Sequence, residues 1–373
     1  MKILINTSTI NQGGALQVAT NLIQYTLNNT EHDYYYIISK EINELKPFRL
    51  ESSRTLITDK SPAKIFNSWN SRMRILKFEE KIKPDLVYSV GAPSYINFKS
   101  KEVIRLTNPT LIGADKIAYS TFKGKDLLVI YLKNIIQRFF IKKTHFVITQ
   151  TQDAKRKINE NLGISTQRIF VVPNTHAEIF KKINKQPKNI VNILCLAAPY
   201  PHKNLSIIPE VAYELKKLGV TNFQFLTTIP EWINNNEIKK LRRLSKNLRV
   251  EDQIKNLGRI SLEECLKWYY KSDVVFLPTL LEVFSATHIE AMATGTPVVT
   301  TDLPFCREIC QEGALYFAPK NEKDAAEKIH KLLTDKELYE KKIAQADQVV
   351  KSLPNPNEIY RMHIKTLEKI FNA

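Results

Sequence analysis

Two glutamates, Glu282 and Glu290, stand eight positions apart in the stretch LPTLLEVFSATHIEAMATGTPVV, in a chain of 373 residues with a net charge of +17. The surrounding residues predict a strand at 273–278 and a helix at 287–294, because Gly295 suits a left-handed helix end and a proline follows it. Glu282 is therefore expected on the loop beyond a strand's carboxyl end, and Glu290 about one turn into the helix. In a parallel α/β sheet, this edge is where ligands bind.

The start of the predicted helix has the chemistry of an anion site. Helix starts gather unpaired N–H groups and positive partial charge, so the amides of Ser285, Ala286 and Thr287 would suit a phosphate or diphosphate. A glutamate beside that anion needs hydroxyl groups to bind, and sugars and ribose supply them. The structural alternative makes Glu282 a solvated loop residue and Glu290 a helix glutamate favoured by the dipole.

The elements that must position these residues alternate between strands and helices. In residues 1–175, apolar segments such as KILINT and THFVITQT alternate with helical patterns such as ALQVATNLIQYTLN. Apolar strands separated by helices favour a parallel sheet covered on both faces. Residues 1–175 are therefore predicted to form one doubly wound α/β domain, with Gly13 and Gly14 in its first turn.

A second strand-and-helix series follows a predicted linker. Residues 176–188 lose periodicity and gain Pro, Asn and Lys, and the alternation resumes over 189–353. Residues 354–373 read as a separate helix that could pack back on the N-terminal domain. Lys203 falls on the first strand-to-helix loop of the second domain, where a phosphate role is expected. The alternative is a solvated loop lysine.

Most of the chain resembles the family 4 glycosyltransferases. The pattern E-x7-E followed by AMATGTPVV is similar to that family's nucleotide-binding signature. NQGGALQVATNL resembles its N-terminal glycine loop, VVPN its interdomain link, and PHKNL its basic loop. The resemblance is dense after residue 190 and thinner before it. It implies the GT-B fold, in which two Rossmann-like α/β domains face each other across a cleft, and sugar transfer with retention of anomeric configuration.

The resemblance also implies roles for individual residues toward a nucleotide-diphosphate sugar. Lys203 would neutralise the leaving diphosphate, and amides at Ser285 and Ala286 would bind its oxygens. Glu290 would hold the ribose hydroxyls and Glu282 the donor sugar. Fixed donors and a lysine can stabilise the charge on a leaving oxygen, so neither a metal nor another cofactor is expected.

Several positions depart from the family pattern. The family commonly has glycines where Val283 and Ser285 stand, and an arginine before the loop lysine, where this chain has AAPYP. Arg259 is the candidate for supplying that missing charge. A histidine that faces the donor sugar in the family's N-terminal domain is replaced here by Asn108, which becomes the candidate sugar contact. Gly13 and Gly14 complete the expected donor-binding set.

The basic residues concentrate in the N-terminal half. Residues 1–187 contain 29 Lys and Arg against 15 Asp and Glu, whereas 188–373 contain 26 against 23. This asymmetry indicates an anionic partner, a phospholipid surface or nucleic acid, and compositional bias is the alternative. In residues 127–143, four polar side chains share one narrow helical stripe and leave a wide apolar face. That helix would either lie on an anionic membrane or bury its apolar face in the first domain.

The predicted function is that of a retaining, hexosyltransferase-type enzyme. It would move a sugar to a saccharide acceptor, polyprenyl-diphosphate-linked, in the synthesis of a surface polysaccharide such as capsule, O-antigen or exopolysaccharide. A nucleotide-sugar epimerase on the same fold is one alternative. A basic nucleic-acid-binding protein is the least favoured, because the sequence carries no helix-turn-helix, zinc-finger or aromatic RNA-binding signature.

The location is expected to be the cytoplasm, peripheral on the inner face of the cell membrane. The opening residues MKILINTST read as a strand rather than a secretory signal, and no stretch of 18 uncharged apolar residues occurs. The four cysteines are scattered and form no C-x-x-C pair, so they are predicted to be free thiols.

Overall fold

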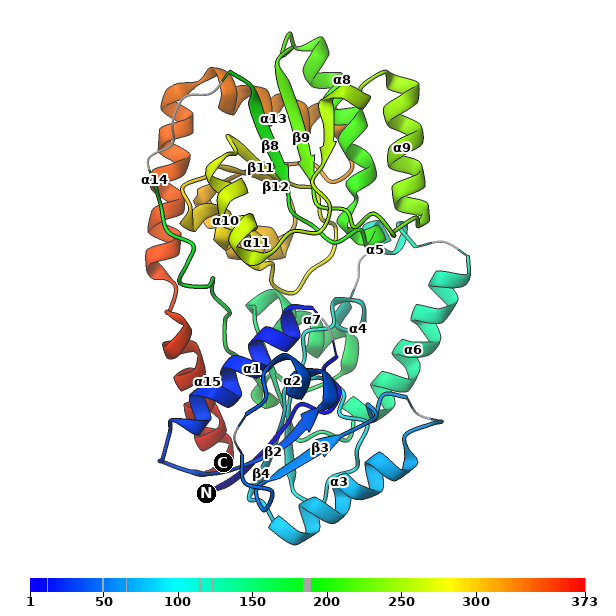
Figure 1. Cartoon of the computed structure of the whole chain (residues 1–373), viewed down its shortest axis with the longest axis vertical. Coiled ribbons are helices and arrows are strands. Elements are labelled where there is room, and N and C mark those ends of the chain that lie inside the picture. Colours follow the sequence, from blue (N-terminus) through cyan, green and yellow to red (C-terminus); the bar gives the residue numbers. More distant parts are fainter. Residues whose placement is uncertain are drawn as a thin grey trace. The chain divides into compact units, whose positions relative to one another are not determined.

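The computed structural model describes residues 1–11, 13–48, 50–64, 66–113, 116–122, 124–183 and 189–372. The chain divides into two compact units (Figure 1). Unit 1 comprises Met1–Gly113, Leu128–Pro173 and Asn357–Ala373, and unit 2 comprises Ala114–Leu127 and Asn174–Pro356. The sequence predicted a single boundary at residue 175. It did not predict that residues 114–127 group with unit 2.

Unit 1 is built on a seven-stranded parallel sheet with the strand order β3-β2-β1-β4-β5-β6-β7. The strands are β1 (Lys2–Asn6), β2 (Asp33–Ser39), β3 (Thr55–Thr58), β4 (Leu86–Ser89), β5 (Lys101–Arg105), β6 (Phe146–Thr149) and β7 (Ile169–Val171). Its helices are α1 (Gly14–Leu27), α2 (Lys40–Leu45), α3 (Trp69–Ile82), α4 (Pro109–Gly113), α6 (Lys125–Ile141, whose first turn lies at the boundary), α7 (Gln152–Leu162) and α15 (Pro356–Phe371).

Side chains on both faces of this sheet are buried. Ile3 and Ile5 point to one face, where they pack with α1 and α15, and Leu4 points to the other face with residues of α3. Successive side chains of a strand alternate between faces, so a run such as KILIN fills two core layers at once. This is why the strands read as nearly continuous apolar segments.

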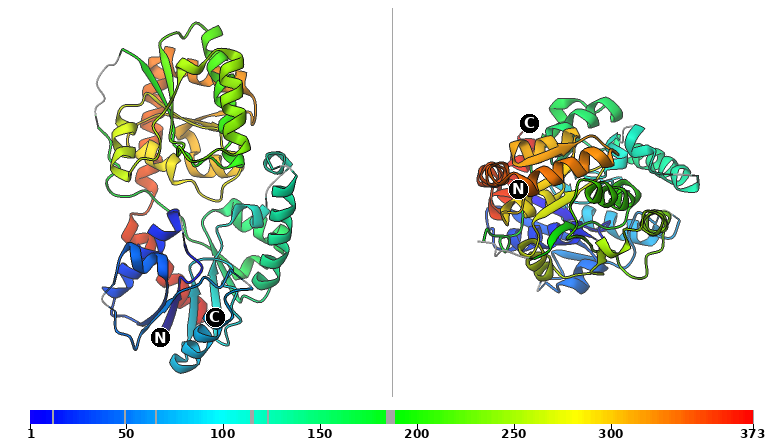
Figure 2. Two further views of the ribbon diagram at one scale, coloured as in Figure 1. Left: turned by 45° about the vertical axis from the view of Figure 1, so that its right-hand side comes forward. Right: turned by 90° about the horizontal axis from the view of Figure 1, so that it is seen from above.

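The last helix, α15, packs on unit 1 and carries the C-terminus close to the N-terminus (Figures 1 and 2). Leu367 and Ile370 are fully buried in the core that β1 and β2 share. His363 Nδ1 lies 2.9 Å from the Tyr88 hydroxyl of β4, and Glu368 pairs with His32 at 2.9 Å. The helix therefore completes a core whose strands come from the opposite end of the chain.

Unit 2 repeats the doubly wound arrangement with six parallel strands in the order β10-β9-β8-β11-β12-β13. The strands are β8 (Val191–Cys195), β9 (Phe223–Thr227), β10 (Ile254–Asn256), β11 (Val274–Leu277), β12 (Val298–Thr301) and β13 (Ala314–Phe317). The helices are α5 (Lys116–Tyr119), α8 (Ile208–Lys217), α9 (Asn236–Leu248), α10 (Leu262–Tyr270), α11 (Ala286–Ala293), α12 (Pro304–Cys310), α13 (Glu322–Thr334) and α14 (Lys336–Ser352).

Two apolar cores cover the sheet of unit 2. Helices α8, α9 and α13 contribute to one core, and α10, α11, α12 and α14 to the other. Phe180, from the predicted linker 176–188, is buried in the second core, with its ring edge-on to Tyr269 at 5.6 Å. Part of that linker thus belongs to the core of unit 2, and its residues 184–188 lie outside the described residues. The four cysteines are free thiols.

The strand orders reverse between β1 and β4 in unit 1, and between β8 and β11 in unit 2. At such a point the two following connections leave on opposite faces of the sheet, which opens a crevice at the carboxyl ends of the strands. In unit 2 the loops after β8 and β11 contain Lys203 and Glu282. The two parallel α/β sheets confirm the predicted fold class.

Candidate functional site in unit 2

Lys203 and Glu282 form an ion pair at the carboxyl edge of the unit 2 sheet. Lys203 ends a short 3-10 helix, Pro201–Lys203, after β8, and Glu282 lies on the loop after β11. Because β8 and β11 are hydrogen-bonded neighbours, the loops that follow them meet although they are 79 positions apart. Each side chain is only 17% exposed, so the pair is held in place rather than solvated freely.

A backbone hydrogen bond joins these two loops. The amide of Leu280 donates to the carbonyl of His202 at 2.7 Å. Asn204, which directly follows Lys203, has φ 54° in the left-handed region and separates this 3-10 helix from the next one, Leu205–Ile207. Asparagine tolerates this conformation better than most residues, because its short polar side chain can bond locally. The loop that carries Lys203 therefore has a defined backbone conformation.

The two histidines beside Lys203 are neutral at pH 7. Burial, and then the charge of Lys203, lowers the pKa of His202 to about 4. The same two causes lower the pKa of His288, in α11, to about 3. His288 Nε2 instead bonds to the Thr300 hydroxyl at 2.8 Å. Lys203 is therefore the cation of this cluster. A lysine ammonium can attract an anion as a single point charge.

Helix α11 begins with free backbone donors beside the ion pair. Its N-terminal cap is Ser285, whose side chain makes no capping hydrogen bond. The amides of Ser285, Ala286 and Thr287 donate to no acceptor among the described residues. The first amides of a helix have no partner within the helix, and an anion can satisfy them. The predicted helix at 287–294 thus begins one residue earlier and has the expected open start.

Glu290 lies one turn into α11 and is positioned by a tyrosine from the preceding helix. The Tyr269 hydroxyl donates to Glu290 Oε2 at 2.9 Å, and Tyr269 itself is fully buried at the end of α10. Burial raises the pKa of Glu290, and the hydrogen bond from Tyr269 opposes that rise. The carboxylate is therefore oriented by a fixed donor. Tyr269 was not predicted as a site residue. It lies 21 positions before Glu290, and no sequence pattern links two residues at that distance.

The remaining predicted site residues occupy other places in the fold. Arg259 is exposed on the connection between β10 and α10. Gly13 and Gly14, at the start of α1, and Asn108 belong to unit 1. Asn108 caps α4, because its Oδ1 accepts from the Thr110 amide at 3.2 Å and hydroxyl at 2.9 Å. Asn108, the candidate sugar contact, thus already holds a helix start within unit 1.

Gly13 has a conformation that favours glycine. Its φ of 69° and ψ of −161° lie in a region that residues with a Cβ rarely enter. A Cβ added at Gly13 or at Gly14 would meet no atom of the described residues within 4 Å, so these residues leave the backbone open on this side. The open surface allows close approach to the start of α1, as expected of a glycine loop.

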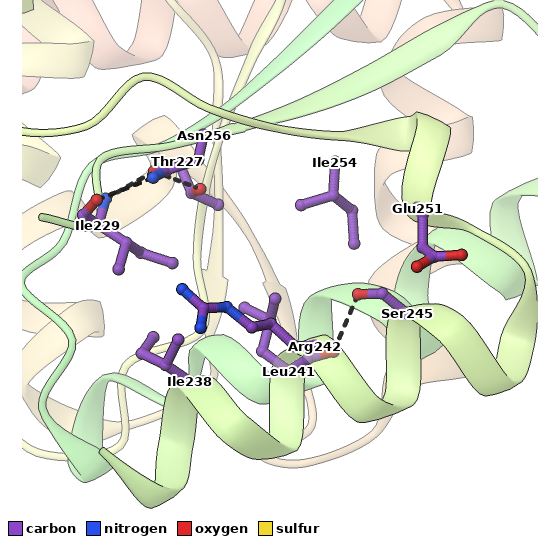
Figure 3. A pocket seen from close by; sticks show the side chains of 9 residues that line it. All are labelled: Thr227, Ile229, Ile238, Leu241, Arg242, Ser245, Glu251, Ile254 and Asn256. Atoms are coloured by element: carbon purple, nitrogen blue, oxygen red, sulfur yellow. Dashed lines mark hydrogen bonds between the residues drawn. The ribbon is translucent and has the colours of Figure 1, made fainter. Parts of the chain in front are cut away.

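A separate pocket of unit 2 lies between α9 and the ends of β9 and β10 (Figure 3). Figure 3 shows the Arg242 side chain beside Ile238 and Leu241, and Asn256 bonded to Thr227 and Ile229. None of its nine lining residues is a predicted site residue. The hydrogen bonds of Asn256 fix the loop after β9, so a structural role accounts for Asn256 and Thr227.

One group of metal-ligand side chains occurs among the described residues. The ligand atoms of Glu31, His32 and Glu368, in unit 1, lie within 4.8 Å of one another. His32 and Glu368 already bond to each other at 2.9 Å. None of the three belongs to the site of unit 2, and exposed acidic groups of this kind are common without a metal.

Comparison with known proteins finds a family match in the second half of the chain. Residues 175–349 match the model of the family described as glycosyl transferases group 1. The O-antigen chain mannosyltransferase RfbU of Salmonella typhimurium is 24% identical over 238 residues, which span 61% of this chain and 64% of that protein. The matched region is therefore less than two thirds of that relative's length.

Solved structures of glycosyltransferases superpose on nearly the whole chain. A glycosyltransferase from Rickettsia africae superposes with a TM-score of 0.74 at 18% identity, covering 99% of this chain and 98% of the other. Anabaena Alr3699/HepE in complex with UDP-glucose has a TM-score of 0.73 at 15% identity, covering 99% and 100%. These similarities establish the GT-B fold that the sequence predicted. The region that matches the glycosyl transferases group 1 family, residues 175–349, lies within unit 2.

Proposed function

We propose that the protein is a retaining glycosyltransferase that moves a sugar from a nucleotide-diphosphate sugar to a saccharide acceptor. The observation that carries this proposal is one cluster in unit 2. It combines a lysine paired with a glutamate, unpartnered amides at the start of α11, and a second glutamate oriented one helix turn further on. The family match over 175–349 and a structural neighbour with bound UDP-glucose support the same donor class.

Each group of the cluster has a role that follows from its chemistry. The amides of Ser285 and Ala286, together with Lys203, would receive the diphosphate and stabilise the negative charge that grows on its oxygen as the glycosyl bond breaks. A diphosphate would compete with Glu282 for Lys203. Glu282, released from the lysine, could then accept hydrogen bonds from hydroxyls of the donor sugar. Glu290, held by Tyr269, would accept those of the ribose.

The proposed setting is the synthesis of a surface polysaccharide, with a lipid-linked saccharide as the acceptor. One relative is named as an O-antigen chain mannosyltransferase, which supports this setting. No helix among the described residues is long and apolar enough to cross a bilayer. We therefore propose peripheral attachment to an anionic membrane, on the inner face of the cell membrane. No metal is proposed, because the lysine and the amides already supply positive charge to the diphosphate.

Nucleotide binding tests the cluster directly. Calorimetric titration of the wild type with UDP, GDP and other nucleotides is expected to show one preferred nucleotide. Glu290→Gln should weaken its binding about tenfold or more, since hydrogen bonds to a charged group contribute about 1.5–3 kcal/mol. The matched control is Glu263→Gln, on the exposed first turn of α10, which should bind as the wild type does.

Two further outcomes discriminate among the functions. Absence of nucleotide binding by folded wild-type protein would contradict the glycosyltransferase proposal. Conversion of a nucleotide sugar without any acceptor would instead support an epimerase on the same fold. NMR of the anomeric centre in donor and product tests retention, because the one-bond carbon–proton coupling constant distinguishes the two configurations.

A further inference from the structure

Helix α6 turns its polar stripe inward and its apolar face outward. Its buried residues are Asn134, Gln137 and Ile141, with exposures of 7%, 4% and 1%. The sequence left two possibilities for this helix, and burial of its apolar face in the first domain is contradicted. An ordinary surface helix does the reverse, because water solvates its polar side and the core takes its apolar side.

Hydrogen bonds from other segments of unit 1 fix this orientation. The Asn134 amide donates to the carbonyl of Thr110 at 2.9 Å. The Gln137 amide donates to the Tyr95 hydroxyl at 2.8 Å and accepts from Asn108 at 3.0 Å. A rotation of α6 that buried its apolar face would break these bonds and leave the buried Tyr95 hydroxyl without the Gln137 amide, which costs free energy. The outward apolar face is thus a stable feature of the unit.

The outward face is a continuous apolar surface. Seven large apolar side chains in the part of α6 that belongs to unit 1 are each between 43% and 63% exposed: Leu128, Val129, Tyr131, Leu132, Ile135, Ile136 and Phe139. At 100° per residue they cover about half of the helix circumference. Figures 1 and 2 show α6 at the edge of unit 1, with its outer side facing away from that unit. Exposed apolar surfaces of this continuity mark sites of interaction.

Cations border this apolar face on both sides. By the same helical spacing, Arg138 lies along one edge and Lys133 along the other, and Lys142 and Lys143 follow the last turn. All four are exposed, and Lys143 Nζ lies 4.5 Å from the centre of the Phe139 ring. The sequence from 127 to 143 contains no Asp or Glu. No carboxylate among the described residues pairs with these cations.

We propose that α6 is a membrane-docking helix that lies in the plane of an anionic lipid surface. Its apolar face would enter the boundary of the acyl chains, and the bordering lysines and arginine would extend to the lipid phosphates. Charge complementarity selects this occupant, because an apolar face with cations on both edges and no acids matches an anionic headgroup layer. The inference deepens the proposed function by naming the element that brings the enzyme to a lipid-linked acceptor.

Vesicle binding by the full chain tests the proposal. Wild-type protein should co-sediment with vesicles of phosphatidylglycerol and phosphatidylcholine in equal parts, and much less with phosphatidylcholine alone. Leu132→Asp should lower the partition about tenfold, because a large apolar side chain no longer enters the lipid. The matched control is Leu45→Asp, a similarly exposed leucine on α2, which should bind as the wild type does. Replacing Lys142 and Lys143 by Gln should lower the partition about fivefold per charge.

A spectroscopic variant locates the helix directly. Tryptophan emission should shift to shorter wavelength on adding anionic vesicles to Leu132→Trp, and should not shift in the same way for Leu45→Trp. Absence of co-sedimentation, or equal losses for Leu132→Asp and Leu45→Asp, would overturn the proposal. Light scattering that shows a dimer lost in Leu132→Asp, without vesicle binding, would assign the face to a second copy instead. Nucleotide titration without vesicles reports on the proposed function separately, so the two failures are distinguishable.

Discussion

The carboxyl group of Glu102 should make the stability of unit 1 depend on pH. Glu102 lies on β5, is 7% exposed, and accepts a hydrogen bond from the Ser89 hydroxyl at 2.6 Å. Burial, with a smaller contribution from the charge of Glu79, raises its pKa from 4.5 to about 7. A change of that size corresponds to about 3 kcal/mol between the two protonation states. The folded state therefore holds this proton more tightly than the unfolded chain does.

The sign of the effect follows from that difference in proton binding. The stability that Glu102 contributes is fully present below pH 4.5 and is lost as the pH rises through 7. Glu102→Gln keeps an oxygen for Ser89 but does not titrate. The stability of the variant relative to the wild type should therefore rise by about 3 kcal/mol between pH 4.5 and pH 8.

Urea unfolding at a series of pH values, followed by circular dichroism, measures this difference. The control is Glu80→Gln, an exposed glutamate on α3 that pairs with Lys99 at 3.1 Å. Exposed pairs contribute about 0–1 kcal/mol, so its pH profile should stay close to that of the wild type. A Glu102→Gln profile parallel to the wild type from pH 4.5 to pH 8 would refute the reasoning.

Three further predictions concern the site and the glycine loop. Tyr269→Phe should weaken nucleotide binding in calorimetry about tenfold with little loss of helicity, because Glu290 loses its orienting donor, worth about 1.5 kcal/mol. Lys203→Met should reduce the affinity for nucleoside diphosphates more than that for nucleosides, and equal losses in the two titrations would contradict its phosphate role. Gly13→Ala should lower the unfolding free energy by about 1–3 kcal/mol, because of its backbone conformation. Gly14→Ala, in the helix and with open space around it, should not lower stability in the same urea assay.

Local sequence patterns were enough to predict the strand and the helix that carry the site. The apolar run before Pro278 gave a strand now seen as β11 (Val274–Leu277), and Gly295 and Pro297 marked the end of α11. These signals depend on short-range sterics, since glycine accepts positive φ and proline cannot continue a helix. Glu282 and Glu290 could therefore be placed on a loop and a helix before any contact was known.

The contacts that turn these residues into a site are long-range. Lys203 meets Glu282 because β8 and β11 pair, and the sheet order that brings them together depends on the packing of the whole unit. Tyr269 meets Glu290 through the packing of α10 and α11 in one core. Periodicity describes one element at a time, so it could not reveal either contact.

Helix α6 separates most clearly what the sequence determined from what the tertiary structure decided. Its pattern alone fixed a helix with a polar stripe and a wide apolar face. Which face is buried depended on the partners available, and Asn134 and Gln137 find theirs in Thr110, Tyr95 and Asn108. A buried polar group without a hydrogen-bond partner costs free energy, and the inward stripe supplies partners to the polar groups of unit 1. The polar stripe of α6 is therefore buried, and its apolar face is exposed.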